Sequence, residues 1–237
     1  MNQNDFYRMV DEAEGRRSIA FPALMRKVYT WMAMALAITG VTAFGVASSP
    51  NLMAMIFSSK IAFFGIMIAE LAVVFYLSAR IQKMSLTTAT LAFILYSVLN
   101  GVTMASIFVV FTMSSIASTF FICAATFAVM SVIGYTTKSD LSSLGKLMFM
   151  ALIGLIIATV VNIFVGSSLL STIISYAGVL IFVGLTAWDT QKIKEMAMQY
   201  DYMDEGIQKL GVLGALTLYL DFINLFIHLL SILGDRK

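Results

Sequence analysis

Two aspartates stand inside apolar runs near the end of the chain. Asp189 lies in "GLTAWDTQ" (184–191) and Asp221 lies in "LTLYLDFINLF" (216–226). An acid near the centre of a bilayer costs about 2.5–3.5 kcal/mol to insert, so a retained acid is paired or used. Two carboxyl groups in a poorly solvated site cannot both ionise at low cost. They can share one proton, and the pair then titrates in two coupled steps. Such a pair can gate helix packing by pH, and its oxygens also suit Ca²⁺.

The segment that carries Asp221 has a single polar stripe. Its polar residues recur every three or four positions, which places them within about 80° of one another on a helix. They are Thr217, Asp221, Asn224, His228 and Ser231. We expect the stripe to face the protein interior or water. Alone, Asn224 is typical of an interhelical hydrogen bond, and His228 of a hydrogen-bonded residue near the outer end.

A third acid and a cation lie in an earlier apolar segment. Glu70 falls near its middle, and Arg80 follows ten residues later at its end, about 15 Å along a helix. Asp189 closes its own segment on the same predicted side, and Asp221 lies about ten residues into the next. We therefore expect Arg80, Asp189 and Asp221 at neighbouring depths. The alternative for Asp189 is that it faces interfacial water at a helix end.

The composition places these residues in a membrane protein. Of 237 residues, 60% are hydrophobic and 12% are charged, about half the charged share of a soluble domain. The mean hydropathy is +0.92. A net charge of +2 does not indicate a nucleic-acid partner. The single cysteine, Cys123, excludes an intrachain disulfide, and no cofactor motif is present.

The apolar runs predict an all-α integral membrane domain over residues 29–237, after an N-terminal tail over 1–28. Each run has the length of a membrane-spanning helix, about 20 residues, and none shows the alternation of a barrel strand. The seven predicted spans are about 29–46, 61–80, 86–110, 115–135, 147–165, 169–189 and 211–233.

The basic residues predict the orientation. If the seven spans cross the membrane in turn, 12 of the 15 Lys and Arg lie on the same side of the membrane as the N-terminal tail. The other three lie on the opposite side. The excess places the N-terminal tail in the cytoplasm. The connection over 191–209 mixes both charge signs and is predicted to lie in water.

The two aspartate segments together resemble the signature pair of the Bax inhibitor-1 family, the transmembrane Bax inhibitor motif proteins. The likeness covers the chain: a basic tail, seven spans, Glu70 and Arg80 in the second span, and an aspartate in each of the last two. It implies a last helix that is central and wrapped by the other six. It also implies a pH-sensitive calcium leak, with Asp189 and Asp221 as its di-aspartyl sensor and Arg80 as their cationic partner.

The chain departs from the family pattern at Ser231. Many relatives have an arginine at that place, ten residues after the last aspartate, within reach of the second-span glutamate. Glu70 therefore needs another partner, and a protonated state or His228 is the expectation. We take Glu70, Asn224 and His228 as polar residues that support the ion path.

Other functions stay open at this point. A non-conducting membrane regulator or interaction protein, of a stress or cell-death type, fits the same residues. An intramembrane aspartyl protease would need a Gly-x-Gly-Asp motif, and residues 217–220 before Asp221 contain no glycine. A proton-coupled transporter would show repeats and broken helices. We expect a non-enzymatic, bacterial cytoplasmic-membrane protein whose partners are lipid, Ca²⁺ and protons, with Asp189 and Asp221 as the Ca²⁺ ligands.

Overall fold

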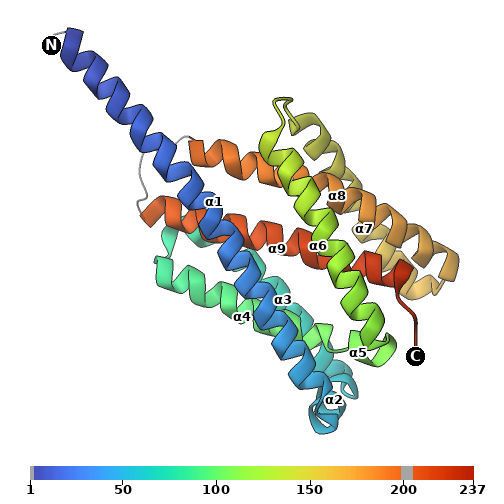
Figure 1. The fold of residues 1–237 in the computed structure, drawn as a ribbon. Coiled ribbons are helices and arrows are strands. Elements are labelled where there is room, and N and C mark those ends of the chain that lie inside the picture. Colours follow the sequence, from blue (N-terminus) through green and yellow to red (C-terminus); the bar gives the residue numbers. More distant parts are fainter. Residues whose placement is uncertain (1–2, 199–204) are drawn as a thin grey trace.

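The computed structural model describes residues 3–198 and 205–237, and side chains from residue 22 onward except that of Lys60. Within these ranges it is almost entirely helical (Figure 1). The elements are α1 (Gln3–Ala47), α2 (Pro50–Phe57), α3 (Lys60–Arg80), η1 (Ile81–Lys83), α4 (Leu86–Met104), α5 (Ile107–Val110), α6 (Met113–Thr136), α7 (Ser142–Val165), α8 (Ser168–Met198) and α9 (Glu205–Leu233).

Seven segments of the described chain are long and apolar enough to cross a membrane, so the predicted fold class is confirmed. They are Pro22–Ala47, Ile61–Lys83, Leu86–Val110, Met113–Thr136, Ser142–Val165, Ser168–Met198 and Glu205–Leu233. The third segment holds two helices, α4 and α5, separated at Ala105 and Ser106. Residues 3–28 of the predicted tail have a helical backbone that continues into the first span.

Helix α8 is longer than the predicted sixth span. The prediction ends the span at Asp189, whereas α8 continues to Met198. Lys192, Lys194 and Glu195 end the apolar run, but they are good helix formers and so the helix does not stop. Residues 191–198 and 205–209 of the predicted aqueous connection are helical, and its location in water stays a prediction. Its middle, 199–204, lies outside the described residues.

Helix α9 is the central element. In its most apolar window 67% of the residues are buried inside the protein, against 6% in α3 and in α7. Helices α1, α4, α6 and α8 pack directly on α9, while α3 packs mainly on α4 and α7 mainly on α8. In Figure 1, α1 and α6 cross in front of α9. The last helix is therefore surrounded by an inner set of four helices, with α3 and α7 outside them.

Side-chain caps mark where several helices begin. Ser49, Ser59, Ser85 and Thr112 each accept a hydrogen bond from a backbone N–H in the first turn of α2, α3, α4 and α6. These bonds satisfy donors that the helix itself leaves free, which matters most at a membrane boundary. Helix α7 is followed by Gly166, whose φ of 66° is the left-handed conformation that favours glycine.

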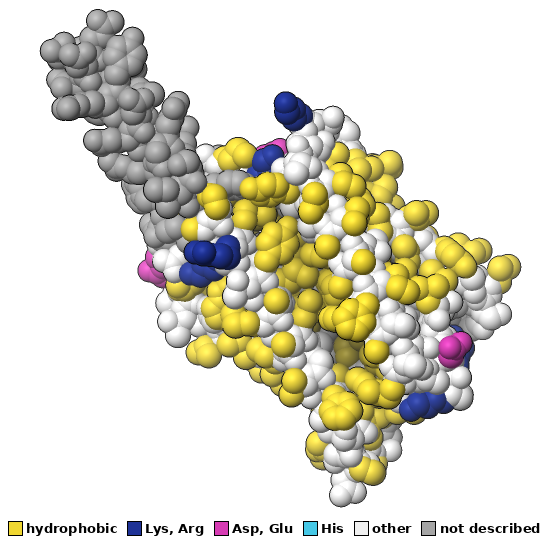
Figure 2. All heavy atoms as spheres, viewed as in Figure 1, with side chains coloured by type: hydrophobic (Ala, Val, Ile, Leu, Met, Phe, Trp, Pro, Cys, Tyr) yellow, Lys and Arg dark blue, Asp and Glu magenta, His cyan; other side chains and the backbone are white. Residues whose placement is uncertain are grey.

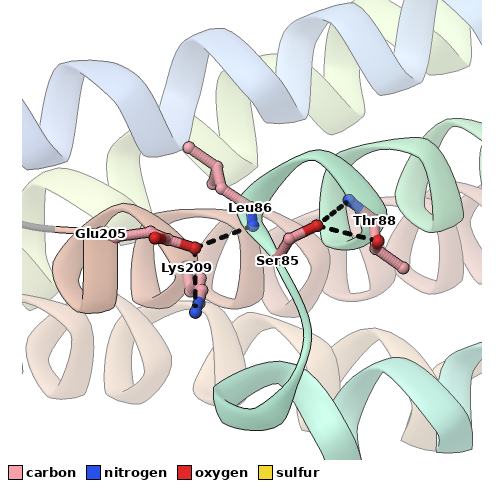
Figure 3. A network of polar contacts seen from close by, with 5 residues as sticks. All are labelled: Ser85, Leu86, Thr88, Glu205 and Lys209. Carbon is pink, nitrogen blue, oxygen red and sulfur yellow. Dashed lines mark hydrogen bonds and ion pairs between the residues drawn. The ribbon is translucent and has the colours of Figure 1, made fainter.

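The start of α9 is tied to the start of α4 (Figure 3). The Leu86 backbone N–H donates to Glu205 Oε1 at 3.3 Å, and the Lys209 ammonium lies 3.1 Å from the same oxygen. Beside them, Ser85 Oγ accepts from the Thr88 N–H at 3.1 Å and lies 2.9 Å from the Thr88 hydroxyl. This network fixes the N-terminal end of the central helix against α4.

The C-terminal residues fold back on the connection between α5 and α6. The Thr112 N–H donates to the Asp235 carbonyl and the Lys237 N–H donates to the Val110 carbonyl, both at 3.0 Å. The Ser115 hydroxyl lies 3.2 Å from an Asp235 carboxylate oxygen and accepts from the Asp235 N–H at 3.0 Å. We call this pairing the C-terminal clasp. It holds the end of α9 against α6.

The outer surface suits a lipid environment. Figure 2 shows hydrophobic side chains over the face between α1 and α6, with charged side chains gathered at two opposite ends. Many large apolar residues are exposed, among them Ile61, Ile163 and Phe164, each more than 70% exposed. A soluble monomer rarely exposes apolar patches of this extent. In a bilayer the same residues face acyl chains.

Candidate functional site

The two aspartates face each other between α8 and α9. Asp189 is 8% exposed and Asp221 is 4% exposed, and their carboxyl groups lie close enough to share a hydrogen bond. Asp221 lies sixteen residues after the start of α9 and twelve before its end, so it is near the middle of the helix. Asp189 lies nine residues before the end of α8. Asp189 is therefore a buried residue within α8 and does not stand at a helix end, as the alternative assumed.

One oxygen of the pair has no partner. Asp221 Oδ2 is buried and makes no hydrogen bond with any residue in the described part of the chain. Buried polar groups are normally satisfied, because leaving one unpaired costs about 1–3 kcal/mol. Asp221 Oδ2 is an exception to this rule, and it belongs to a buried acid beside a second acid. Such an oxygen is a candidate to take up a proton or a cation.

A pocket of about 460 Å³ opens beside the pair. Its walls come from three helices, α7, α8 and α9. Apolar side chains form most of the wall, and the polar ones gather where α8 meets α9. The lining residues are Phe149, Leu152, Ile156, Phe182, Leu185, Trp188, Asp189, Lys192, Thr217, Leu220, Asp221 and Asn224.

The polar stripe of α9 faces this pocket over part of its length. Thr217, Asp221 and Asn224 line the pocket, as the spacing predicts. Thr217 Oγ1 donates to the Leu213 carbonyl at 3.1 Å and Asn224 Nδ2 donates to the Leu220 carbonyl at 2.8 Å. Since these donors are engaged within α9, both side chains keep oxygen lone pairs as acceptors.

The outer end of the stripe does not reach the pocket. The His228 ring stacks on Phe182, with centroids 5.8 Å apart and planes 23° apart. It packs so closely on Gly178 of α8 that a Cβ there would overlap the imidazole. Ser231 is exposed and donates to the Ile227 carbonyl at 2.9 Å. His228 is thus a packing residue between α8 and α9, and not part of the pocket wall.

The cation beside the pair is Lys192, and the expectation of Arg80 is wrong in this structure. Arg80 is exposed at the end of α3, with its guanidinium 6.0 Å from the Tyr76 ring centroid. Lys192 lines the pocket, lies 5.0 Å from the Trp188 ring centroid and interacts electrostatically with Asp189. The sequence contained a signal for Lys192, because it follows Asp189 by three residues and residues three apart share a helix face. The prediction ended the helix too early to use it.

Glu70 belongs to a separate polar cluster, and the expected pairing with His228 is wrong. The Thr103 hydroxyl donates to Glu70 Oε1 at 2.8 Å, linking α3 to α4. Further along α4, the Tyr219 hydroxyl of α9 donates to Asn100 Oδ1 at 3.1 Å and lies 2.6 Å from Thr39 Oγ1. Sequence reasoning found Glu70 but had no way to find Thr103, since hydroxyl residues occur in every span.

Gln191, which was not singled out from the sequence, fixes the end of the site. Its side chain is buried on α8, accepts from the Leu141 N–H at 2.8 Å and donates to the Ser139 carbonyl at 2.9 Å. It therefore anchors the connection between α6 and α7 two residues after Asp189. In that connection, hydrogen bonds from Ser142 hold the pKa of the exposed Asp140 below its usual range.

The acid pair is not a complete metal cage. Within residues 3–198 and 205–237, no three His, Cys, Asp or Glu side chains gather as ligands. Ca²⁺ takes six to eight oxygens, and here two carboxylates, one hydroxyl and one amide oxygen line the same pocket. Water would have to supply the rest. These four protein oxygens are fewer than Ca²⁺ takes, so the pocket by itself does not complete a Ca²⁺ site.

The fold and the pocket define a class: a helical integral membrane protein with a buried di-acid site beside its central helix. A model of the family described as "Inhibitor of apoptosis-promoting Bax1" matches residues 22–237. The chain belongs to this family, as the two aspartate segments indicated.

Several relatives resemble the chain over most of its length. The Escherichia coli K12 inner membrane protein YbhL is 50% identical over 214 residues, covering 90% of this chain and 92% of the relative. A Borreliella burgdorferi protein is 41% identical over 230 residues, 97% of this chain and 99% of the relative. A Streptococcus pyogenes serotype M1 membrane protein is 42% identical over 185 residues, 78% of this chain and 79% of the relative.

Proposed function

We propose that the protein is a pH-sensitive Ca²⁺ leak in a bacterial cytoplasmic membrane, gated by the protonation of Asp189 and Asp221. One observation carries the proposal: two buried carboxyl groups face each other at a pocket, and Asp221 Oδ2 has no hydrogen-bond partner among the described residues. The name of the YbhL relative, an inner membrane protein, supports the choice of membrane.

The charges around the pocket give the direction of the pH effect on Ca²⁺ binding. With both aspartates ionised the site carries two negative charges, which Lys192 offsets by one. A net negative pocket attracts a divalent cation, and low-dielectric walls strengthen that attraction. Each proton taken up removes one negative charge, so Ca²⁺ binding at the pair weakens as the pH falls.

The ligand set supports transport over storage. Conduction needs a site strong enough to admit an ion and weak enough to release it. Thr217 and Asn224 add acceptor oxygens to the two carboxylates, and the remaining ligands would be water. Lys192 would compete with Ca²⁺ for Asp189, which further favours release. The proposal involves no catalytic chemistry.

The direct test is Ca²⁺ influx into liposomes that contain the purified protein, measured from about pH 5 to about pH 8. Three proteins are compared: wild type, Asp221→Asn and the control Asp140→Asn. Asp140 is an exposed acid outside the spans, so its neutralisation leaves the pocket unchanged. We expect a pH-dependent flux in wild type and control, and a flux without pH dependence in Asp221→Asn.

Equal flux in protein-containing and empty liposomes at every pH would refute the leak. The non-conducting regulator would then be the better interpretation, and it predicts that Asp221→Asn changes stability or partner binding without changing ion flux. A flux whose pH profile is the same in Asp221→Asn as in wild type would keep the leak and refute its gate.

A further inference from the structure

A second feature of the molecule lies on the opposite side of α9 from the acid pocket. Helices α1 and α6 both pack on α9, and side chains of all three helices line a groove between them. We call it the α1–α6 groove. Its walls include Leu36 and Gly40 of α1 with Phe120 and Ala128 of α6, and its floor is formed by Phe222 and Phe226 of α9.

The groove is mostly apolar. It consists of two hollows of about 100 Å³ and 290 Å³, which share Leu36 and Phe222. Its two polar lining residues are Thr39, already hydrogen-bonded to Tyr219, and Ser131. Figure 2 shows the hydrophobic side chains of this face. In a membrane such a groove opens toward lipid, and its chemistry fits an acyl chain.

One end of the groove carries positive charge. Arg26 is exposed and lines a third hollow that shares Tyr29 and Ala33 with the groove. Trp31 lines an adjoining hollow with Arg26. Tyrosine, tryptophan and arginine together are typical of the level of the lipid headgroups. Basic residues at that level attract anionic lipids.

The dimensions match one phospholipid. From Arg26 to Gly40 there are fourteen residues, or about 21 Å along α1. One leaflet, half of a core about 30 Å thick with its headgroup layer, is also roughly 20–22 Å. A lipid aligned with α1 would therefore place its phosphate at Arg26 and the end of its chain near Gly40.

We propose that the α1–α6 groove binds an anionic phospholipid, whose phosphate contacts Arg26 and whose acyl chain lies over Phe222 and Phe226. The chain contacts the central helix directly on the floor of the groove. Phe222 follows Asp221 in the sequence, so the bound lipid packs on the same turn of α9 that carries the acid pair. The lipid site and the acid site are thus on opposite faces of one helical turn.

The test is native mass spectrometry of the purified protein, titrated with phosphatidylglycerol or phosphatidylcholine of identical acyl chains. We expect one phosphatidylglycerol to remain bound at activation energies that remove phosphatidylcholine. Arg26→Gln should reduce the preference for phosphatidylglycerol about fivefold, as expected for one basic residue at a membrane surface. Lys83→Gln removes an exposed charge at the end of the second span and should leave the preference unchanged.

The acyl-chain part is tested by filling the groove. Gly40→Leu adds a side chain in the groove where no atom lies within 4 Å of a Cβ, so the fold tolerates it. We expect it to lower the occupancy of both lipids. Gly154→Leu is the matched control, because Gly154 is equally open but lies on α7. Ala128→Leu, on the other wall, is a second groove variant should Gly40→Leu not fold.

Three results would overturn the proposal. They are equal retention of the two lipids by wild type, which indicates annular lipid only; equal lipid occupancy in Gly40→Leu, Ala128→Leu and Gly154→Leu; and a dimer that forms in place of the bound lipid.

Discussion

Replacing Asp221 with asparagine should stabilise the protein at high pH, because the wild-type site holds two acids face to face. In the described structure the buried Asp221 Oδ2 has no hydrogen-bond partner and Asp189 lies beside it, so ionisation of both acids at high pH brings two like charges together. An asparagine of the same shape removes one like charge and brings an N–H that can donate to Asp189. A hydrogen bond to a charged group contributes about 1.5–3 kcal/mol, and an unsatisfied buried group costs about 1–3 kcal/mol. The unpaired second N–H of the new amide roughly offsets the unpaired Oδ2 of the wild type, so the new hydrogen bond sets the net gain, about 1–3 kcal/mol.

The single cysteine provides the assay. Cys123 is fully buried on α6, with its thiol 3.6 Å from the Phe222 carbonyl of the central helix. A thiol reagent reaches it only when the helices open, so the labelling rate follows the open fraction. A gain of 1–3 kcal/mol makes labelling of Asp221→Asn about 5–150-fold slower than that of wild type at the same pH.

Two comparisons make the result specific to the pair. Asp189→Asn should gain less than Asp221→Asn, because it also loses the attraction between Asp189 and Lys192. The advantage of Asp221→Asn should shrink as the pH falls, since a proton shared by the two acids makes the same hydrogen bond in wild type. Labelling of Asp221→Asn at high pH that is as fast as wild type, or faster, would refute the reasoning.

Three further predictions concern helix contacts. Gly134→Ala would place a Cβ against a backbone carbonyl of α8, so we expect a loss of about 1–3 kcal/mol in the free energy of unfolding and a lower Tm. In the control Gly154→Ala the new Cβ meets no atom within 4 Å, and this variant should melt like wild type. Tyr219→Phe removes a buried hydroxyl and takes the donor away from Asn100 Oδ1, while Thr39 keeps its bond to the Ser97 carbonyl; denaturant unfolding should therefore show a loss of about 1–3 kcal/mol. Asp235→Ala weakens the C-terminal clasp, and hydrogen exchange at the Thr112 amide should become faster while exchange in the middle of α9 does not change.

The sequence was sufficient for the architecture because a bilayer leaves few choices. A backbone in hydrocarbon must satisfy its own hydrogen bonds, so each apolar run of about 20 residues becomes a helix. The same argument failed at the end of α8, where hydropathy falls at Lys192 but helix propensity does not. The predicted boundary described the edge of the apolar run, and not the end of the helix.

The candidate site was predicted in part. Periodicity placed Thr217, Asp221 and Asn224 on one face, and they share one pocket with Asp189. Periodicity could not predict which helices contact each other. It shows which residues share a face of one helix, but not which other helix packs on that face. Arg80 has a suitable depth and charge, yet α3 packs on α4 and not beside the pair.

The position of α9 has a consequence for how the chain is made. A ribosome completes the spans in order, so α9 is synthesised after α1, α4, α6 and α8, the four helices that pack on it. Until it arrives, Asp189 has neither Asp221 beside it nor a closed pocket around it, and the inner faces of the earlier helices meet lipid or one another. Packing around α9 therefore follows the synthesis of the other spans, and a chain interrupted before Glu205 would lack the central helix and leave Asp189 without Asp221.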